Sequence, residues 1–232
     1  MIGIFDSGVG GICALRQVRK MLPCEDIIYL ADRKNAPYGT KTPEEILKFT
    51  ENNIRKLKEC GAVRILIACC TASSLYDSLP TWARDVSLPI IRPAAIKAAQ
   101  VGQNIVVIAT RHTCGISAFG GEIKRLSDAR VIEYAEQELV TLVERGNRDG
   151  RLDKESKEYL DRLSEKIRLS EADTLVLGCT HFSHLENEIH HRLPNIKIIS
   201  PARVGAEKIV EMIDPTEREN GRVRYISPLV KN

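Results

Sequence analysis

The sequence is poor in aromatic residues and has no long apolar run. Aromatics make up 5% of the 232 residues, so the core must be mostly aliphatic. No apolar stretch approaches the roughly 20 residues that a membrane-spanning helix needs. The start, Ile2-Gly3-Ile4-Phe5-Asp6, lacks the basic region of a signal peptide, so we expect a cytoplasmic protein. The net charge of +3 comes without a Lys/Arg block, so we expect neither a membrane nor direct nucleic-acid binding.

The seven cysteines do not form a disulfide or zinc pattern. Their number is odd, their spacing is irregular, and there is no C-x-x-C pair. These features argue against a disulfide framework. Cys69 and Cys70 are adjacent, which makes them poor tetrahedral zinc ligands, so we expect no metal site. The cysteines expected to be ordinary buried or half-buried thiols are Cys13, Cys24, Cys60 and Cys114.

Apolar strands alternate with amphipathic helices along the chain. This alternation predicts an α/β fold with mostly parallel sheets. The expected strands are residues 2–5, 26–29, 63–68, 88–91, 104–109, 130–134, 174–177, 196–199 and a short strand-like stretch at 223–226. The expected helices are residues 11–22, 43–60, a helix from about 72, 114–126, 136–144, 154–170, 185–193 and 206–213. Thr42 and Glu45 have the spacing of a capping box, and Gly61 is a helix stop.

The two series of strands and helices resemble each other. Residues 2–5 and 104–109 are both followed closely by a hydroxyl residue, and each series contains one strand that ends in a cysteine. We infer two pseudo-symmetric α/β domains with the active site in the cleft between them. The first would contain residues 1–92 and about 206–232, and the second residues 93–205. The crossover would lie near Arg92-Pro93, with the chain returning near Pro201.

The two cysteine-bearing strands are the most informative feature. Residues 65–73 read ILIACCTAS and residues 175–181 read LVLGCTH. Each predicts a buried strand, a cysteine at its carboxyl end and then a helix start, and ligands bind at that end of α/β sheets. A helix N-terminus favours the thiolate and lowers the pKa of the thiol. Two such thiols, Cys69 and Cys179, indicate an acid/base pair that faces one substrate from opposite sides. A single nucleophile with a histidine partner, as in a cysteine hydrolase, is an alternative.

Other polar residues follow the predicted strands. The turn Asp6-Ser7-Gly8-Val9-Gly10-Gly11 could present backbone N–H groups to an anion, or could simply be tight, with Asp6 a polar sheet-end residue. Thr71 and Thr180 offer hydroxyls to a carboxylate or an amine. His181 could hold the Cys179 thiol or a substrate amine in the right protonation state, or could cap a helix. Surface positions are expected for His184, His190 and His191.

These motifs together resemble the bacterial glutamate racemases of the aspartate/glutamate racemase family. The resemblance rests on Ile4-Phe5-Asp6-Ser7-Gly8-Val9-Gly10-Gly11, on Pro37-Tyr38-Gly39, on the Ala68-Cys69 … Thr71-Ala72-Ser73 segment and on Leu177-Gly178-Cys179-Thr180-His181. They occur in family order from residue 2 to about 212. The resemblance implies a cofactor-independent amino-acid racemase that supplies D-glutamate for peptidoglycan, with a small amino acid as substrate and a homodimer as the expected assembly.

The resemblance also implies roles for individual residues. In the family one cysteine thiolate removes the α-proton and the other cysteine, as a thiol, donates a proton to the opposite face. Carried over, Cys69 and Cys179 would be that pair. Assisting residues would be Asp6, His181 and Glu144. The substrate-binding positions would be Asp6, Ser7, Pro37, Tyr38, Gly39, Cys70, Thr71, Thr180 and His181.

Two positions depart from the family pattern. Cys70 stands where the family has an asparagine that hydrogen-bonds the amino-acid head group, and Arg92 precedes Pro93 where the family has Glu or Gln. Cysteine is a weak donor and acceptor, so about 1–3 kcal/mol of binding could be lost. These departures keep open a sister racemase acting on aspartate or another amino acid, or a weakly active or regulatory paralogue such as a protein that inhibits DNA gyrase.

Overall fold

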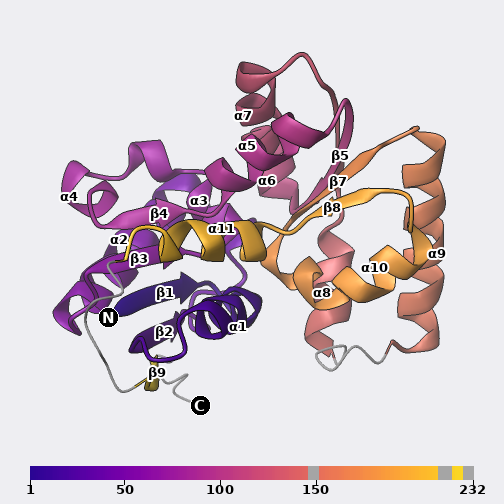
Figure 1. The fold of residues 1–232 in the computed structure, drawn as a ribbon. Helices are drawn as coiled ribbons and strands as arrows, with labels where there is room; N and C mark the ends of the chain where they lie inside the picture. The colour runs from indigo at the N-terminus through magenta and orange to yellow at the C-terminus, as the bar shows by residue number, and fades with distance from the viewer. Residues whose placement is uncertain (146–151, 214–220, 227–232) are drawn as a thin grey trace. The chain divides into compact units, whose positions relative to one another are not determined.

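The computed structural model describes residues 1–145, 152–213 and 221–226, and these form two compact units (Figure 1). Unit 1 contains Met1–Ile90 and the chain from Ala202 onward, and unit 2 contains Ile91–Pro201. Most of the polar C-terminal tail, residues 214–220 and 227–232, lies outside the described residues. Each unit is built on its own parallel sheet, which confirms the α/β class expected from the alternation of strands and helices.

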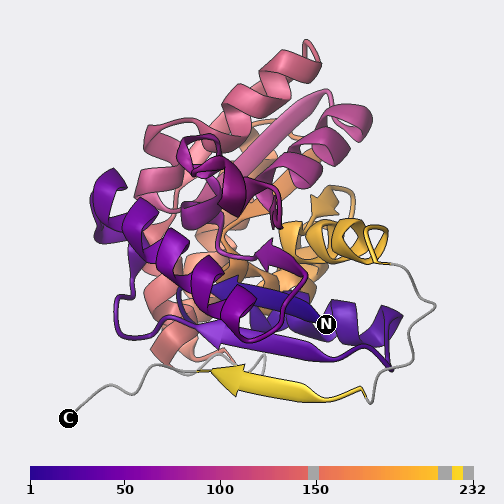
Figure 2. The same ribbon diagram turned by 90° about the vertical axis from the view of Figure 1, so that its left-hand side faces the viewer.

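Unit 1 is a five-stranded sheet with strand order β4-β3-β1-β2-β9, and every neighbouring pair is parallel. The strands are β1 (Ile2–Asp6), β2 (Ile27–Ala31), β3 (Arg64–Ile67), β4 (Ser87–Pro89) and β9 (Val223–Ile226). The helices are α1 (Ile12–Met21), α2 (Pro43–Glu59), α3 (Cys70–Ser73), α4 (Thr81–Arg84) and α11 (Pro201–Val210), with 3-10 turns η1 (Tyr38–Thr40) and η2 (Tyr76–Ser78). Figure 2 shows β9, the yellow strand, beside β2 at one edge.

Helices cover both faces of the unit 1 sheet, so its inner strands are buried along their whole length and mostly apolar. Every residue of β1 and β2 is buried, as is typical of parallel strands covered on both sides. α2 packs on one face through Ile46, Ile54 and Leu57. On the other face lie α1 and α11 (Figure 1), where Gly205 of α11 leaves no room for a side chain against Ile90. The parallel pairing of β1 with β3 places the carboxyl ends of these two strands side by side.

Unit 2 is a four-stranded parallel sheet with strand order β6-β5-β7-β8. The strands are β5 (Asn104–Ala109), β6 (Arg130–Ala135), β7 (Thr174–Gly178) and β8 (Lys197–Ile199). The helices are α5 (Ile91–Val101), α6 (Arg111–Gly115), α7 (Ala118–Leu126), α8 (Gln137–Arg145), α9 (Lys154–Leu169) and α10 (Glu186–Arg192), with the 3-10 turn η4 (Thr180–Leu185). In Figure 1, α8, α9 and α10 lie on one face of this sheet and α5 and α7 on the other.

The two sheets share one topology. Read from opposite ends, unit 1 runs β4-β3-β1-β2 and unit 2 runs β8-β7-β5-β6. Strand β1 therefore corresponds to β5, and β3 corresponds to β7. The cysteine-bearing strands of the two units thus occupy equivalent places, each beside the first strand of its own sheet.

The capping residues at the start of α2 and the glycine after its end were predicted correctly from the sequence. Thr42 Oγ1 accepts the Glu45 N–H at 3.3 Å, and the Glu45 carboxylate accepts the Thr42 N–H at 2.9 Å. The predicted capping box of α2 is therefore confirmed. Gly61 follows with φ +96°, a left-handed conformation that suits glycine after a helix end.

The expected strand at residues 88–91 was partly wrong. β4 ends at Pro89, and Ile91 already begins α5, a helix the sequence analysis did not predict. Its buried face consists largely of Ala94, Ala95 and Ala98, so its amphipathic signal is weak although alanine favours helix. Pro93 lies in the first turn, where proline needs no N–H partner.

A single helix was expected at residues 114–126, and this prediction was also partly wrong, because the segment forms two helices. The chain forms α6 and α7, separated at Ser117, which has φ +47°. α6 begins earlier than expected because Thr110 caps it by accepting the Thr113 N–H at 3.3 Å. The expected helix at 206–213 likewise begins earlier, at Pro201, and ends at Val210.

The helices that follow the two cysteines are shorter than expected. After Cys69 the chain makes only the four-residue α3, and after Cys179 it makes the 3-10 turn η4 before α10 begins at Glu186, not Leu185. In α3 the Ser73 and Ser74 hydroxyls donate to the carbonyls of Ile67 and Thr71. Such side-chain bonds compete with helical ones. The helix dipole acting on each thiol is therefore that of about one or two turns.

Candidate active-site clusters

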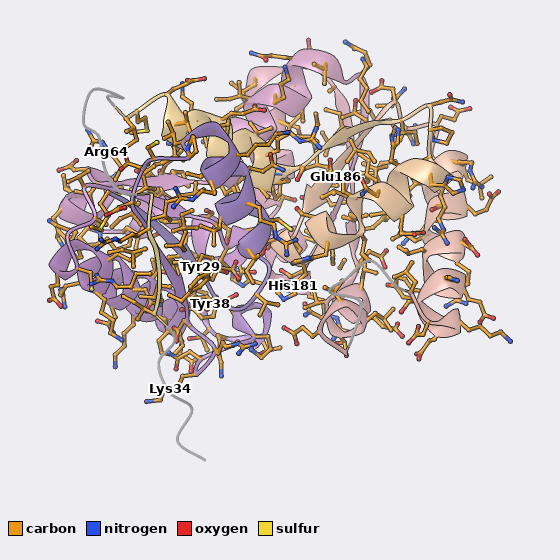
Figure 3. All side chains as sticks on the ribbon, turned by 60° about the horizontal axis from the view of Figure 1, so that its bottom comes forward. Tyr29, Lys34, Tyr38, Arg64, His181 and Glu186 are labelled. Carbon is orange, nitrogen blue, oxygen red and sulfur yellow. The ribbon has the colours of Figure 1, made fainter. Side chains whose placement is uncertain are left out.

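A chain of three side chains lies at the carboxyl end of β7 in unit 2. The Sγ atom of Cys179 is 3.6 Å from Nδ1 of His181, and Nε2 of His181 is 3.1 Å from Oε1 of Glu144. Cys179 and His181 are buried, whereas the Glu144 side chain is 45% exposed. The cluster brings together the end of β7, the turn η4 and the last residues of α8, and Figure 3 labels His181 within it.

The geometry of this cluster assigns a direction to its hydrogen bonds. An ionised carboxylate only accepts hydrogen bonds, so Nε2 of His181 carries a proton and donates it to Glu144. In the neutral ring, Nδ1 is then the acceptor and faces the Cys179 thiol. Glu144 also stabilises the imidazolium that forms if Nδ1 takes the thiol proton. The three residues can therefore move a proton on or off Cys179.

In unit 1 the corresponding thiol is held beside the end of β1. The Ala68 N–H donates to the Phe5 carbonyl at 2.8 Å, which sets Cys69 next to Ser7. Cys69 donates from Sγ to Ser7 Oγ at 3.3 Å, and its side chain is only 4% exposed. Asp6, one residue before Ser7, is fully buried. The Asp6 carboxylate, the Ser7 hydroxyl and the Cys69 thiol thus lie together at the carboxyl ends of β1 and β3.

Asp6 is held by the turn that follows it. The Gly8 N–H donates to Asp6 Oδ2 at 2.8 Å, and Tyr29 from β2 donates its hydroxyl to the Gly8 carbonyl at 3.2 Å. A Cβ at Gly11 would lie 2.6 Å from the Asp6 Cβ and 3.0 Å from the Tyr29 hydroxyl. Gly11 is therefore required for this packing. Burial, reinforced by the charges of Asp6 and neighbouring cysteines, raises the pKa of Tyr29 well above its ordinary value, so it stays a neutral donor.

Tyr38 is oriented into the protein. Its hydroxyl donates to Asp32 Oδ2 at 2.7 Å and accepts from Asn53 Nδ2 at 3.1 Å, and its side chain is 1% exposed. Burial and the Asp32 hydrogen bond raise the pKa of Tyr38 far above its ordinary value. The Pro37-Tyr38-Gly39 turn is thus anchored by a buried polar network, and Pro37 itself is exposed. Tyr29 and Tyr38 are both labelled in Figure 3.

The remaining predicted binding residues lie directly beside the two cysteines. Cys70 and Thr71 are the first two residues of α3, and Thr180 is the first of η4; all three are buried. The register also matches across units, because Phe5 pairs with Ile67 and Ala109 pairs with Gly178. Ser7 and Thr110 therefore stand in equivalent places beside Cys69 and Cys179. Thr110, however, uses its hydroxyl to cap α6.

Several residues outside these clusters correct the sequence-based expectations. His190 and His191 are exposed as predicted, but His184 lies in η4 and is half-buried, so its surface assignment was wrong. Cys24 is exposed, whereas Cys13, Cys60 and Cys114 are half-buried. Burial, with the Glu133 charge, raises the pKa of Cys114 to about 12, which makes this thiol unreactive. In the described part of the chain, no three His, Cys, Asp or Glu side chains are grouped to hold a metal ion.

Three residues that support the site were not predicted from the sequence. Tyr29, Asp32 and Asn53 hold the two loops beside Cys69, but none belongs to a glycine-rich turn or a cysteine motif. Asn53 lies 21 residues from Asp32 and contacts it only because α2 packs on the sheet. The one available signal was a polar residue inside the apolar face of α2.

Comparisons with known proteins show which family the chain is similar to. The family model described as Asp/Glu/Hydantoin racemase matches residues 13–209. A curated relative, the glutamate racemase of Gloeobacter violaceus, is 36% identical over 224 residues, which cover 94% of this chain and 82% of the relative. The crystal structure of a glutamate racemase isoform from Bacillus anthracis is 27% identical with a TM-score of 0.83, covering 98% of this chain and 87% of that one.

A third similarity concerns the fold alone. The glutamate racemase of Francisella tularensis, crystallised in complex with D-glutamate, is 23% identical with a TM-score of 0.79, covering 97% of this chain and 87% of that one. Taken together, the matches show that the chain belongs to the Asp/Glu/hydantoin racemase family. The resemblance inferred from the motifs is confirmed, and so is the prediction that the chain is an enzyme of the racemase class, an isomerase. No helix within the described residues is long and apolar enough to cross a membrane.

Proposed function

We propose that this protein interconverts L- and D-glutamate by passing the Cα proton between Cys69 and Cys179, without a metal or an organic cofactor. The observation that carries the proposal is the topological equivalence of the two thiols. Each follows the same strand of its own parallel sheet, and each touches a polar partner, Ser7 or His181. A two-base reaction needs two proton carriers, one for each face of Cα, whereas a single-nucleophile hydrolase would need only one reactive thiol.

The proton balance of the reaction is simple. One cysteine acts as a thiolate, removes the proton from Cα and becomes a thiol. The other, which begins as a thiol, delivers its proton to the opposite face of Cα and becomes a thiolate. The amino acid leaves inverted, and the two cysteines have exchanged protonation states. In the reverse direction the roles of Cys69 and Cys179 are exchanged.

His181 and Glu144 supply the proton exchange on the side of Cys179. Because Nδ1 of His181 faces the thiol, it can take the proton that makes Cys179 a thiolate and return it later. Glu144 holds the ring orientation and stabilises its charged form. On the side of Cys69, the buried carboxylate of Asp6 and the hydroxyl of Ser7 assist. The α-proton of an amino acid is a very weak acid, so fixed donors on the carboxylate and exclusion of water must lower the barrier further.

Substrate binding falls to the residues beside the cysteines. We assign the carboxylates and the ammonium group to Ser7, Cys70, Thr71, Thr180, and the Pro37-Tyr38-Gly39 turn. Since the Tyr38 hydroxyl is engaged with Asp32, that turn contributes its backbone rather than the phenol. Asp6 and His181, which assist the thiols, also serve the ammonium group in this account.

The choice of glutamate rests on the relatives. The relatives described above are named glutamate racemases, and one was crystallised with D-glutamate. The supply of D-glutamate for peptidoglycan belongs to the same proposal. The cytoplasmic location and the homodimer stay predictions.

The test is a substrate panel without added cofactor. Purified protein, treated with a metal chelator, is incubated with each enantiomer of glutamate and of aspartate, and the products are separated by chiral chromatography. We expect racemisation of both glutamate enantiomers at much higher kcat/KM than of aspartate. Faster turnover of aspartate would instead establish a sister racemase, and folded protein that racemises neither acid would contradict the proposal.

A further inference from the structure

A cavity lies in unit 2, on elements that do not carry the cluster of Cys179, His181 and Glu144. Its volume is about 610 Å³, and its lining includes none of Cys179, His181 and Glu144. One wall is formed by alternate residues of the edge strand β6, namely Arg130, Ile132 and Tyr134, which project from the same face of the strand. The other wall is one side of α9, from Arg162 to Leu169.

The floor of this cavity is apolar. Ile132 and Tyr134 are partly buried and pack against the core of the unit. Leu169, at the end of α9, is 76% exposed, which is high for a leucine in a helix. An apolar floor open to water on one side can take a flat hydrophobic group.

The rim is positively charged. Arg130, Arg162 and Lys166 line the cavity, against one carboxylate, Glu165, which is already paired with Arg168. Arg130 and Arg162 are exposed, and neither forms an ion pair within the residues that the structure describes. The guanidinium of Arg162 lies 5.9 Å from the centre of the Tyr159 ring. Two arginines without carboxylate partners, beside an apolar floor, suit a phosphate or a carboxylate.

A smaller cavity of about 170 Å³ adjoins the first, since both are lined by Arg162 and Lys166. It contains Glu136, whose carboxylate is nearly buried and accepts hydrogen bonds from Tyr159 and, at 3.2 Å, from Lys166. Lys166 also lies 3.7 Å from the centre of the Tyr134 ring. Lys166 thus joins the charged rim, the apolar floor and Glu136.

We propose that this groove, defined by Arg130, Ile132, Tyr134, Arg162, Lys166 and Leu169, binds a small organic anion. The phosphate or carboxylate of the ligand lies on the two arginines, and its flat apolar part covers Ile132, Tyr134 and Leu169. The ligand is a molecule of limited size, because the cavity has a volume of about 610 Å³ and three cationic side chains line it.

The position of Glu136 gives such a ligand a route to the catalytic cluster. Glu136 directly precedes α8, and Glu144 lies eight residues further on, a rise of about 12 Å along the helix. A ligand anion that draws Lys166 away from Glu136 changes the interactions at one end of α8, whose other end holds His181 through Glu144. This consequence rests on the proposed function, whereas binding itself does not.

The binding test uses phenyl phosphate, which has one flat ring and one phosphate. Its affinity for the full-length protein is measured by isothermal titration calorimetry, with inorganic phosphate and phenol titrated separately. We expect phenyl phosphate to bind more tightly than either, and Arg130→Gln and Arg162→Gln each to weaken it about tenfold. The matched control is Arg125→Gln, an exposed arginine on α7, which should leave the affinity unchanged.

Three results would overturn the proposal. The first is the absence of phenyl phosphate binding to folded protein. The second is binding that both groove variants leave intact. The third is a change of oligomeric state in Arg162→Gln, which would make the groove a subunit contact. Racemisation is measured in parallel: an inactive protein that still binds phenyl phosphate through Arg162 would refute the proposed function and leave the groove proposal standing.

Discussion

Nε2 of His181 lies 3.1 Å from a carboxylate oxygen of Glu144, and this pair determines which nitrogen of the ring faces the Cys179 thiol. Glu144 lies near the end of α8 and His181 in the turn after β7, 37 positions apart in the sequence. The contact converts a thiol beside a histidine into an acid/base unit of three groups. It also makes the two halves of the proposed reaction unequal, because Cys69 has a hydroxyl partner and Cys179 an imidazole.

The role of Glu144 can be tested by removing only its charge. Glu144→Gln keeps an acceptor for His181 but no longer stabilises the imidazolium, so we expect kcat to fall about 10- to 100-fold. The substitution should also change the kinetic isotope effects of the two enantiomers differently. With substrates deuterated at Cα, the primary isotope effect should increase only for the enantiomer that Cys179 deprotonates. The control is Glu138→Gln, an exposed glutamate on the same helix. Equal changes for both enantiomers would contradict the assignment.

The Tyr38 hydroxyl supports the fold rather than the substrate. Tyr38→Phe removes one hydrogen bond from Asp32 and one from Asn53 in a buried network, so we expect the free energy of unfolding to fall by about 1–3 kcal/mol. KM for glutamate should stay within about twofold of the wild-type value at temperatures where the variant is folded. Urea denaturation measures the first quantity, with Tyr225→Phe as an exposed control. Unchanged stability together with a raised KM would show that the phenol binds substrate.

The sequence predicted the chemistry of the candidate site better than its support. Both cysteine strands, Asp6 and His181 were singled out because strand ends in parallel sheets mark ligand sites, whereas Ser7 and Glu144 were assigned from the family resemblance. Asn53 could not be found in this way, since its contact with Asp32 depends on how α2 packs. The fold was predicted where apolar patterns are strong, as in β5 and α2. The prediction missed α5, because its alanine-rich face gives a weak amphipathic pattern. It also missed the break at Ser117, because no sequence motif indicates the left-handed conformation of this residue.

Cys70 is the residue that departs most clearly from the family pattern at the site. It is buried directly beside Cys69, at the position where the resemblance led us to expect a hydrogen-bonding asparagine. We expect Cys70→Asn to lower KM for glutamate about tenfold with little change in kcat, because one restored hydrogen bond contributes on the order of 1 kcal/mol to binding of substrate and transition state alike. Steady-state kinetics measures both constants. Cys70→Ser is the control for removing the thiol. A higher KM for glutamate with a lower KM for aspartate would indicate a pocket adapted to the shorter acid.

Asp173 makes the stability of unit 2 depend on pH. Its carboxylate accepts the N–H groups of Gln103 and Asn104 and the hydroxyl of Thr174. Desolvation by burial raises its pKa, but these hydrogen bonds, with the charge of Lys197, outweigh that effect and hold the pKa below 3.8. A lowered pKa in the folded state stabilises the protein above the unfolded value, and this contribution is lost as the pH falls through the folded pKa.

Asp173→Asn should therefore be less stable than wild type at neutral pH, and the difference should shrink as the pH falls below about 4. Thermal unfolding of both proteins between neutral and acidic pH measures the effect. Asp128→Asn, which removes an exposed carboxylate from the loop before β6, is the comparison. A stability difference that grows on acidification would contradict the sign of the predicted shift.

The most direct test of the two-cysteine account is deuterium incorporation at Cα in D2O, followed by NMR from each enantiomer of glutamate. Wild type should convert either enantiomer into a product deuterated at Cα. Cys69→Ser and Cys179→Ser should each lose racemisation by at least about a thousandfold while remaining folded, since a serine hydroxyl is a far weaker acid than a thiol. Cys114→Ser should retain the wild-type rate. Racemisation at the wild-type rate by either of the first two variants would contradict the account.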